Sequence, residues 1–484
     1  LRAGNRRGVP CAHRAALAVM LTRVWFLTAG QPLAHGKSYC LNIMYVASKL
    51  PQHLGQSGWV SMLPPRTPRP PLSGTVNADI AVIGGGFAGL SAARRLSQLD
   101  ASLKVVILEA GEIAEGATGR NSGFIIDLPH EVSSEDYGGS DTSERQHDIK
   151  VHRIAIALAQ ALANEKGWGK DIFDPCGKYN VALGLQGDKH VASYAKQLDK
   201  VKEPYKLLDA REIAAVTGTE SFTSAIFTPG TVIIQPAAYI RGLADSFHDR
   251  VKLYENTPAL SFERQGASWL VKTPKGAVST AKIILANNGQ AQSFGLFQGQ
   301  LLHVYTYASM TEAFEPQRLG GQRSWAATPA FPMGTTVRRV EGANGDRILI
   351  RSRYTYNPRM QVSKNAIARA GRVHDRKFEA RFPMLKGIPM EYRWAGAMAL
   401  TWNGVPAFGE IEPGVFAAIA CNGVGATKAT ASGIAAAEAA LGQDSWLVQV
   451  FRGFAAPKRL PPQPFLTIGA TANLSMKEWS AGAE

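Results

Sequence analysis

The stretch from residue 78 to residue 109 constrains the fold of this chain more than any other. An apolar run, Ile80–Ile83, predicts a buried parallel strand and leads directly into the turn Gly84–Gly89. A helical pattern follows, then a second apolar run, Val105–Leu108, and then Glu109, twenty residues after the last glycine of the turn. This order of strand, glycine turn, helix, strand and acid is typical of Rossmann-like dinucleotide-binding folds.

The glycines of this turn have separate predicted roles. Gly84 permits the tight turn, Gly86 lets the backbone approach a pyrophosphate, and Gly89 lets the helix pack close to the strand. The helix start at Phe87 and Ala88 offers N–H groups and a partial positive charge to phosphates. Glu109 would accept hydrogen bonds from the adenosine ribose. Glycines alone more often mark ordinary turns, and it is the whole pattern that favours a dinucleotide site.

The positive charge of the chain is unevenly distributed. The net charge is +15, but residues 1–77 hold nine Lys or Arg and no acid, which leaves only a mild excess elsewhere. Such an excess is typical of a solvated surface, and we expect no nucleic-acid partner. The four cysteines form no CxxC pair, which predicts no metal site, no disulfide framework and a reducing cytoplasm.

Residues 1–43 do not resemble a domain. The chain opens on Leu1, and a basic stretch precedes the apolar run Ala15–Val24, which superficially resembles a secretory signal. The run is too short and too charged to span a membrane, which takes about 20 apolar residues. We favour translation from Met44, with a targeting segment as the alternative. A proline-rich lead-in over 60–74 completes a predicted N-terminal extension, 1–75.

A glycine- and hydroxyl-rich loop, Gly111–Phe124, follows the second strand. Ligands of open α/β sheets bind at the carboxyl ends of strands, although the loop could also be an ordinary surface loop. Later in the chain, Ser143–Lys166 predicts a long helix. Three short strands, Leu260–Arg264, Ser268–Thr273 and Gly276–Thr280, then form a meander. It feeds a separate buried strand that begins at Lys282 and ends in the turn Asn287-Asn288-Gly289.

Residues 300–395 change character. Leu301–Met310, Thr335–Val340 and Arg347–Arg353 alternate as antiparallel strands do, and Lys364–Phe378 predicts a helix. The predicted fold class is therefore α/β (α+β), with an interleaved mixed or antiparallel substrate domain. The expected segments are a discontinuous dinucleotide domain (76–170, 226–299 and 396–445), a substrate domain (171–225 and 300–395) and a C-terminal tail (446–484) packing on the former.

A second glycine turn that could hold the cofactor lies near the C-terminus. The apolar run Gly414–Ala420 predicts a buried strand, and the turn Cys421–Lys428 leads it into a helix of small residues that runs to Leu441. Such a helix start gives a second site for negative charge. A nicotinamide enzyme with one nucleotide fold has no need of it. Reduced flavin carries an anion that this helix start can stabilise, which favours FAD over NAD.

Several motifs recur together in one known family. The fingerprint Gly84–Gly89, the loop Gly116–Gly123, the turn ending at Gly289, the segment Thr401–Gly409 and the turn Asn422–Gly425 resemble the FAD-dependent D-amino-acid oxidase family, which includes glycine and sarcosine oxidases. The loop sequence GATGRNSG and the YRWAG segment that precedes residue 397 are most similar to the gamma-glutamylputrescine oxidase branch. The resemblance covers about residues 55–470.

The resemblance implies extended, non-covalent FAD. Many relatives carry a His where this chain has Val424 and a second Gly where it has Ala395, and we interpret Cys421 as ordinary core rather than a flavin attachment site. The residues expected to contact FAD are Gly84, Gly86, Phe87, Ala88, Gly89, Glu109, Ala110, Ala117, Thr118, Arg120, Asn121, Ser122, Gly123, Asn288, Gly289, Asn422, Gly423, Val424, Gly425, Ala426 and Thr427.

The implied reaction moves a hydride from the carbon beside a neutral amine to flavin N5, and the resulting imine hydrolyses. Oxygen or another acceptor then reoxidises the flavin. Alternation places His303, Tyr305 and Tyr307 on one strand face, and Arg351 with Arg353 on another.

The catalytic candidates are His303, Tyr305, Arg353 and Lys428, the last near a carboxylate-binding lysine of some sarcosine-type relatives. Arg351, Arg353 or Arg393 could bind a carboxylate, although each could equally be a surface or ion-paired arginine. Two other classes stay open, a nicotinamide-linked dehydrogenase and a non-catalytic flavoprotein subunit.

Overall fold

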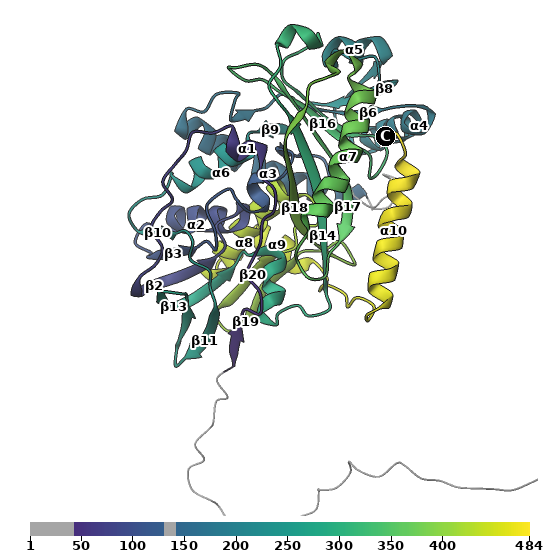
Figure 1. The fold of residues 1–484 in the computed structure, drawn as a ribbon. Helices are drawn as coiled ribbons and strands as arrows, with labels where there is room; N and C mark the ends of the chain where they lie inside the picture. The colour runs from purple at the N-terminus through teal and green to yellow at the C-terminus, as the bar shows by residue number, and fades with distance from the viewer. Residues whose placement is uncertain (1–42, 130–141) are drawn as a thin grey trace, which may run out of the picture. The chain divides into compact units, whose positions relative to one another are not determined.

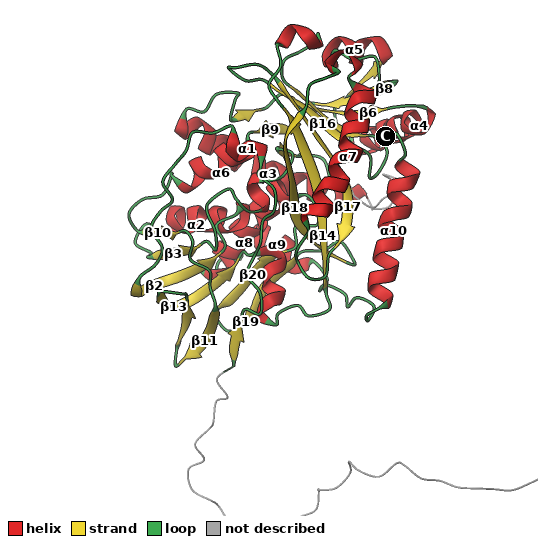
Figure 2. Cartoon of the chain, viewed as in Figure 1, coloured by secondary structure: helices red, strands yellow, loops and turns green. Residues whose placement is uncertain are grey.

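A computed structural model describes residues 43–129 and 142–484 of the chain. Within the predicted extension 1–75, residues 1–42 lie outside the described residues, and Cys11 and Cys40 are among them. The described part contains three β-sheets with helices packed against them, which confirms the predicted α/β (α+β) class (Figure 2).

The first sheet contains the dinucleotide fold. Its path runs β1-β11-β12-β13-β2-β3-β10, and β20 pairs with β13 and β19. The pairs β2–β3, β3–β10, β2–β13 and β13–β20 are parallel, and β3 and β20 are apolar and buried along their whole length. The strands are β1 (Met44–Val46), β2 (Gly74–Ile83), β3 (Val105–Leu108), β10 (Val251–Tyr254), β11 (Ser261–Gln265), β12 (Ser268–Lys272), β13 (Gly276–Leu285), β19 (Ala407–Glu412) and β20 (Val415–Ile419).

The two strands predicted on either side of Ala281 are one strand. β13 runs unbroken from Gly276 to Leu285 because it pairs with β2 along its whole length, from Gly276 opposite Gly74 to Leu285 opposite Ile83. Its first half also closes the antiparallel meander with β12, and its last residues pair with β20. The meander is therefore built directly onto the parallel sheet.

Helices α2 and α8 pack against each other beside this sheet (Figure 1). A glycine permits the contact, since a Cβ on Gly433 would lie 2.1 Å from the Ala88 carbonyl oxygen. The predicted helix Ser143–Lys166 is α3, and the stretch expected to form one helix up to Leu441 begins as a π-helical turn, Gly425–Ala429. The helices are α1 (Gly58–Ser61), α2 (Phe87–Leu99), α3 (Thr142–Lys166), α4 (Leu185–Val201), α5 (Ala210–Thr217), α6 (Pro236–Ala244), α7 (Lys364–Arg381), α8 (Thr430–Ala440), α9 (Trp446–Gly453) and α10 (Phe465–Ala481).

The second sheet has the order β18-β14-β17-β16-β15-β6-β8-β7. It combines strands from both segments that the sequence assigns to a substrate domain. Its long strand β14, next to the edge strand β18, is antiparallel to both of its neighbours. The strands are β6 (Lys178–Ala182), β7 (Lys206–Asp209), β8 (Ser224–Thr228), β14 (Leu301–Thr311), β15 (Trp325–Pro329), β16 (Thr336–Val340), β17 (Arg347–Tyr356) and β18 (Met390–Thr401).

A small third sheet, ordered β4-β9-β5, contains β4 (Phe124–Ile125), β5 (Phe173–Asp174) and β9 (Val232–Ile234). Its first strand continues directly from the glycine-rich loop that follows β3. Across residues 43–129 and 142–484, no helix is both long and apolar enough to cross a membrane.

Candidate active site

A cavity of about 350 Å³ lies where the first and second sheets approach each other. Ile83 and Leu108 contribute to its wall from the ends of β2 and β3, and Ala418 contributes from β20. The opposite wall comes from the second sheet, including His303 of β14 and Arg351 of β17. The cavity therefore opens at the carboxyl ends of the parallel strands, where α/β folds bind ligands.

The glycine turn shapes one end of this cavity. Gly84 has φ +110°, and a Cβ on it would lie 2.7 Å from the Ala286 carbonyl oxygen. A Cβ on Gly89 would lie only 1.8 Å from the Gly84 carbonyl oxygen, so α2 packs tightly against the turn. Gly86 caps α2 without any side-chain hydrogen bond. The backbone at the start of α2 is thus exposed towards the cavity, as phosphate binding requires.

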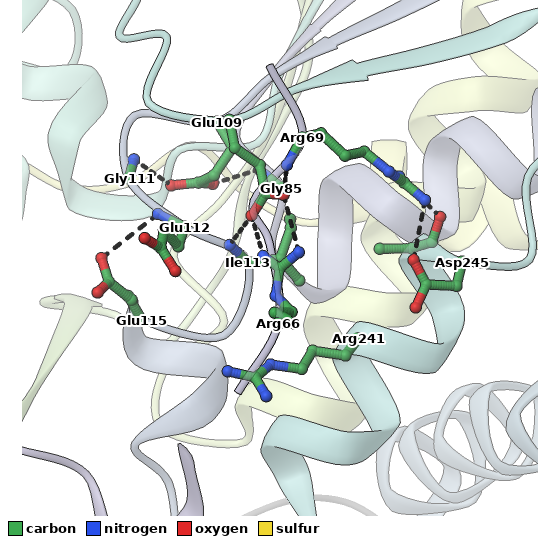
Figure 3. Close-up of polar contacts among 12 residues, drawn as sticks. Arg66, Arg69, Gly85, Glu109, Gly111, Glu112, Ile113, Glu115, Arg241 and Asp245 are labelled. Carbon is green, nitrogen blue, oxygen red and sulfur yellow. Dashed lines mark hydrogen bonds and ion pairs between the residues drawn. The ribbon is translucent and has the colours of Figure 1, made fainter. Parts of the chain in front are cut away.

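Glu109 lies at the end of β3 and faces the turn. Its carboxylate accepts hydrogen bonds from the Gly85 N–H at 2.7 Å and the Gly111 N–H at 3.1 Å (Figure 3). Burial raises the pKa of this carboxyl, and the two backbone donors oppose that shift. Each carboxylate oxygen still has a lone pair available for a ligand hydroxyl.

A second acid, Glu255, supports the loop behind the turn and was not anticipated from the sequence. It is fully buried at the end of β10, where it accepts the Ile113 N–H at 2.6 Å and the Arg69 N–H at 2.7 Å and forms an ion pair with Arg66. Its three partners are labelled in Figure 3. Burial opposes ionisation, but hydrogen bonds from Arg66, Ile113 and Arg69 hold the pKa of Glu255 below its usual value. The proline-rich lead-in is thereby joined to the loop after β3.

Arg120 fixes the glycine-rich loop from within. Its guanidinium is buried and donates to the carbonyl oxygens of Glu115, Leu54, Gly55 and Ala395 at 2.6–3.2 Å. Burial lowers its pKa to about 10. Arg120 lines the cavity, but its Nε and Nη1 already donate to four backbone carbonyls. Its main visible role is to join the loop to β18 and to the segment before α1.

Three amide side chains line the cavity with oxygens that have no partner among the described residues. Asn287 Oδ1, Asn288 Oδ1 and Gln290 Oε1 are all buried. A buried acceptor without a donor costs free energy, on the order of 1–3 kcal/mol. Together these oxygens favour a ligand rich in hydroxyl and N–H donors, such as a flavin with its ribityl chain. The residues present therefore fit FAD.

The C-terminal glycine turn forms another part of the wall of the same cavity. Gly423, Val424 and Gly425 line it as the chain enters the π-helical turn. Asn422 faces elsewhere, with Oδ1 accepting the Thr401 N–H at 2.8 Å. Lys428 also lies outside the cavity wall, where its Nζ pairs with Asp148 Oδ2 at 3.3 Å. Lys428 thus joins the π-helical turn to α3, and its substrate contact stays a prediction.

Two catalytic candidates of β14 line the cavity. His303 Nε2 contacts Gln292 Oε1, and burial together with the charge of Lys49 lowers the pKa of His303 to about 4. Tyr305 donates its hydroxyl hydrogen to the Met360 carbonyl at 2.5 Å, and burial raises its pKa to about 12. Both side chains are therefore neutral near pH 7.

The two arginines of β17 do not lie together as alternation predicts. A β-bulge leaves Arg353 without a partner on β14, with φ +59°, and the face alternation breaks there. Arg351 lines the cavity, donates to the Tyr354 hydroxyl and lies 3.4 Å from Ser122 Oγ. Arg353 lies outside the cavity wall and pairs with Glu478 of α10. Arg393 also lies outside the wall, paired with Asp375.

Most of the expected FAD contacts line the cavity. Those outside its wall are Gly89, Gly123, Asn422 and Thr427. Those in its wall are Gly84, Gly86, Phe87, Ala88, Glu109, Ala110, Ala117, Thr118, Arg120, Asn121, Ser122, Asn288, Gly289, Gly423, Val424, Gly425 and Ala426.

Sequence reasoning missed the segment from Lys49 to His53, together with Thr328, Tyr354 and Met360, all of which line the cavity. The first segment lies before the proline-rich lead-in, where no apolar period or turn motif signals a site. Within the described ranges, no group of three or more His, Cys, Asp or Glu side chains could hold a metal ion.

The parallel sheet, the glycine turn and the cavity define a Rossmann-like dinucleotide-binding fold. Residues 79–439 match the family described as "DAO: FAD dependent oxidoreductase", and the chain belongs to this family. The predicted cofactor, FAD, is confirmed at the level of this family. So is the predicted enzyme class, an FAD-dependent oxidoreductase of amines or amino acids.

Curated relatives are distant but extend over most of the chain. A probable oxidoreductase, OrdL, of Haemophilus influenzae is 26% identical over 400 residues, covering 80% of this chain and 88% of the relative. The gamma-glutamylputrescine oxidoreductase of Escherichia coli is 25% identical over 430 residues, covering 81% and 89%. The latter is in keeping with the branch that the sequence motifs resemble.

Solved structures share the fold. Glycine oxidase from Geobacillus kaustophilus has a TM-score of 0.63 at 19% identity, covering 80% of this chain and all of that one. An L-amino acid deaminase from Proteus myxofaciens, solved with anthranilate, has a TM-score of 0.59 at 16% identity, covering 86% of this chain and 99% of the other.

Proposed function

We propose that this enzyme oxidises the carbon–nitrogen bond of an amine or amino acid that also carries an anionic group. One observation carries this proposal. The cavity runs from the glycine turn to Arg351, a cationic side chain that faces the cavity and has no carboxylate partner in the described part of the chain. A guanidinium in such a position is suited to bind a carboxylate through paired hydrogen bonds.

FAD would lie extended between the glycine turn before α2 and the C-terminal glycine turn. The start of α2 would hold its pyrophosphate, Glu109 its adenosine ribose, and Gly423–Gly425 its ring end, with Asn287, Asn288 and Gln290 accepting from its hydroxyl and N–H groups. When bound, FAD supplies a two-electron acceptor for the oxidation of the carbon–nitrogen bond. We propose non-covalent binding, because burial raises the pKa of the Cys421 thiol and keeps it protonated.

The protein side chains would then bind and orient the substrate. Arg351 would hold its anionic group. Tyr305 has committed its hydrogen to Met360, so its oxygen can accept a hydrogen bond from a substrate amine. Neutral His303 adds no positive charge that would repel that amine. Met360 and Met398 supply apolar cover that limits water around the reacting carbon.

Within this class, we propose a gamma-glutamylated polyamine as the first candidate substrate. Such a molecule carries both an amine and a carboxylate, and the curated relative from Escherichia coli supports the choice. Simple D-amino acids, glycine and sarcosine are the alternatives. We further propose that the protein acts in a reducing cytoplasm, since Cys176 and Cys421 are free thiols. Oxygen and other electron acceptors both remain candidates for reoxidation.

The decisive experiment is an anaerobic reduction screen of the flavin-loaded protein. Glycine, sarcosine, D-amino acids and gamma-glutamylated polyamines are each mixed with the enzyme while the oxidised flavin absorbance is followed. We expect at least one carboxylate-bearing amine to bleach the flavin, and its uncharged analogue to bleach it much more slowly. If dithionite bleaches the flavin and none of the amines does, the proposal fails and a non-catalytic flavoprotein subunit becomes the better interpretation.

A further inference from the structure

The C-terminal helix α10 exposes an unusual set of apolar side chains. Phe465, Ile468, Met476 and Trp479 are 69%, 64%, 62% and 83% exposed. With exposed Ala472 between them, they follow the spacing of one helix face. By contrast, only Leu466 and Ala481 of this helix are buried against the protein. Contiguous exposed apolar surface of this kind marks an interaction site in soluble proteins.

The opposite side of α10 is firmly attached to the protein. Glu478 pairs with Arg353 of β17, and at the far end Arg381 of α7 donates to the Ala483 carbonyl at 2.6 Å. At the start of the helix, the Gln463 side chain donates to the Tyr356 hydroxyl at 3.2 Å. Figure 1 shows α10 in yellow, running along the outside of β17 and α7. The apolar face is therefore presented outward by a helix with a fixed orientation.

Two chain segments near this face carry positive charge and no acid, and the one acid of α10, Glu478, is paired with Arg353. Residues 445–477 contain no Asp or Glu, and neither do residues 347–374. The exposed cations Lys458 and Arg459 lie in the segment that leads into α10. Arg359 and Lys364 follow Tyr356, whose hydroxyl contacts Gln463 at the start of the helix. An apolar helix face flanked by basic chain segments complements a lipid bilayer, which is apolar in its interior and, where its headgroups are anionic, negatively charged at its surface.

We propose that the outward face of α10, namely Phe465, Ile468, Ala472, Met476 and Trp479, docks the protein on an anionic lipid surface. The apolar side chains enter the headgroup boundary, and Lys458, Arg459 and Arg359 contact lipid phosphates. Trp479 and Phe465, at the two ends of this face, are residue types that favour this boundary.

A second copy of the chain fits this face less well. The apolar spacing is sustained for only two heptads, whereas helix pairing is favoured by three or four. A twofold pairing would also bring the same basic segments of two copies towards each other, which is unfavourable. An anionic lipid surface complements both the apolar face of α10 and the positive charge of the basic segments.

Vesicle co-sedimentation of the full-length, flavin-loaded protein tests the proposal. We expect at least about tenfold tighter binding to vesicles containing phosphatidylglycerol than to pure phosphatidylcholine, because several basic side chains lie beside the apolar face. High salt should weaken this binding, and the emission of Trp479 should shift to the blue on binding.

Matched variants locate the surface. Ile468→Ser with Trp479→Ser, and separately Lys458→Glu with Arg459→Glu, should each reduce binding to anionic vesicles at least about tenfold while flavin content stays unchanged. Leu185→Ser on α4, where Leu185 is 81% exposed, is the control and should bind as the wild type does. The proposal is overturned if anionic vesicles do not bind the wild type. It is also overturned if sedimentation velocity shows a dimer that Ile468→Ser dissociates, or if only an acidic protein binds this face.

Discussion

Arg353 forms an ion pair with Glu478, with Nε and Oε1 3.1 Å apart, while Arg351 two residues earlier faces the cavity. A regular strand would have placed both guanidinium groups on the same face. The bulge at Arg353 separates them, so that Arg351 lines the candidate active site and Arg353 pairs with the C-terminal helix α10. One local irregularity thus connects the position of a substrate anchor to the attachment of α10.

This separation predicts different phenotypes for the two arginines. Arg351→Met should raise the KM for a carboxylate-bearing amine roughly 10- to 100-fold, because a charge-assisted hydrogen bond contributes about 1.5–3 kcal/mol. Steady-state kinetics with the best substrate from the reduction screen measures this. Arg353→Met is the matched control and should leave KM within about twofold. Equal effects of both changes would contradict the assignment.

Gly86→Val should abolish retention of FAD while leaving the fold intact. The new side chain would fill the space above the start of α2, where a Cβ alone already lies 3.1 Å from Thr118 Cγ2. Flavin per protein after dialysis is the readout, and circular dichroism checks the fold. Gly453→Ala, at a position with no atom within 4 Å of the new Cβ, serves as the control. Stoichiometric flavin in the Gly86 variant would refute the placement of the cofactor.

Cys421→Ser should keep normal flavin content, since Cys421 lines the cavity but is proposed to form no bond to the cofactor. Acid precipitation of the wild type should release all of the flavin into the supernatant. Flavin that stays with the precipitated wild-type chain and is released from the variant would instead establish covalent attachment at this residue.

Glu255→Gln should lower the free energy of unfolding by about 2–4 kcal/mol, because it leaves Arg66 without its buried partner. Glu255 is fully buried, whereas Arg66 is partly exposed, so we place the loss below that of a completely buried pair. Urea denaturation measures the change, and Glu220→Gln at an exposed position is the control. A loss under about 0.5 kcal/mol would mean that the pair supports the loop without contributing to stability.

The depressed pKa of His303 predicts acid sensitivity. The imidazole has a pKa of about 4 in the folded chain, below the value of about 6.5 expected in the unfolded chain. Between these values the unfolded state binds one more proton, so stability falls as the pH is lowered from about 6.5 to 4, with a limiting slope of about 1.4 kcal/mol per pH unit.

His303→Gln should remove the contribution of this imidazole to the slope of unfolding free energy against pH. Urea unfolding at several pH values compares this variant with His248→Gln, a change at an exposed histidine. Identical pH dependence in the wild type and the His303 variant would show that this imidazole does not titrate as its burial indicates.

Much of the fold could be predicted because its strands carry local signals. Val105–Leu108 matches β3 at both ends, since Lys104 and Glu109 bound a short apolar run. The glycine turn Gly84–Gly89 could be predicted equally well, because binding a dinucleotide requires glycines at set positions. These features depend on residues close together in the sequence.

The parts that escaped prediction depend on partners far along the chain. No residue close to Lys428 in the sequence indicates that its Nζ pairs with Asp148 Oδ2 of α3, 3.3 Å away. The bulge at Arg353 likewise follows from pairing with β14, and the single strand β13 follows from its long pairing with β2. Substrate residues were therefore harder to place than cofactor residues.

The walls of the cavity come from Ala47 at one end to Ser432 at the other. A ribosome delivers these segments in order, so the glycine turn emerges long before the C-terminal turn that completes the pocket. Until β20 has been synthesised, the edge of β13 that it covers stays open. FAD can then be fully enclosed only by a nearly finished polypeptide, which makes cofactor loading a late event in the biogenesis of this enzyme.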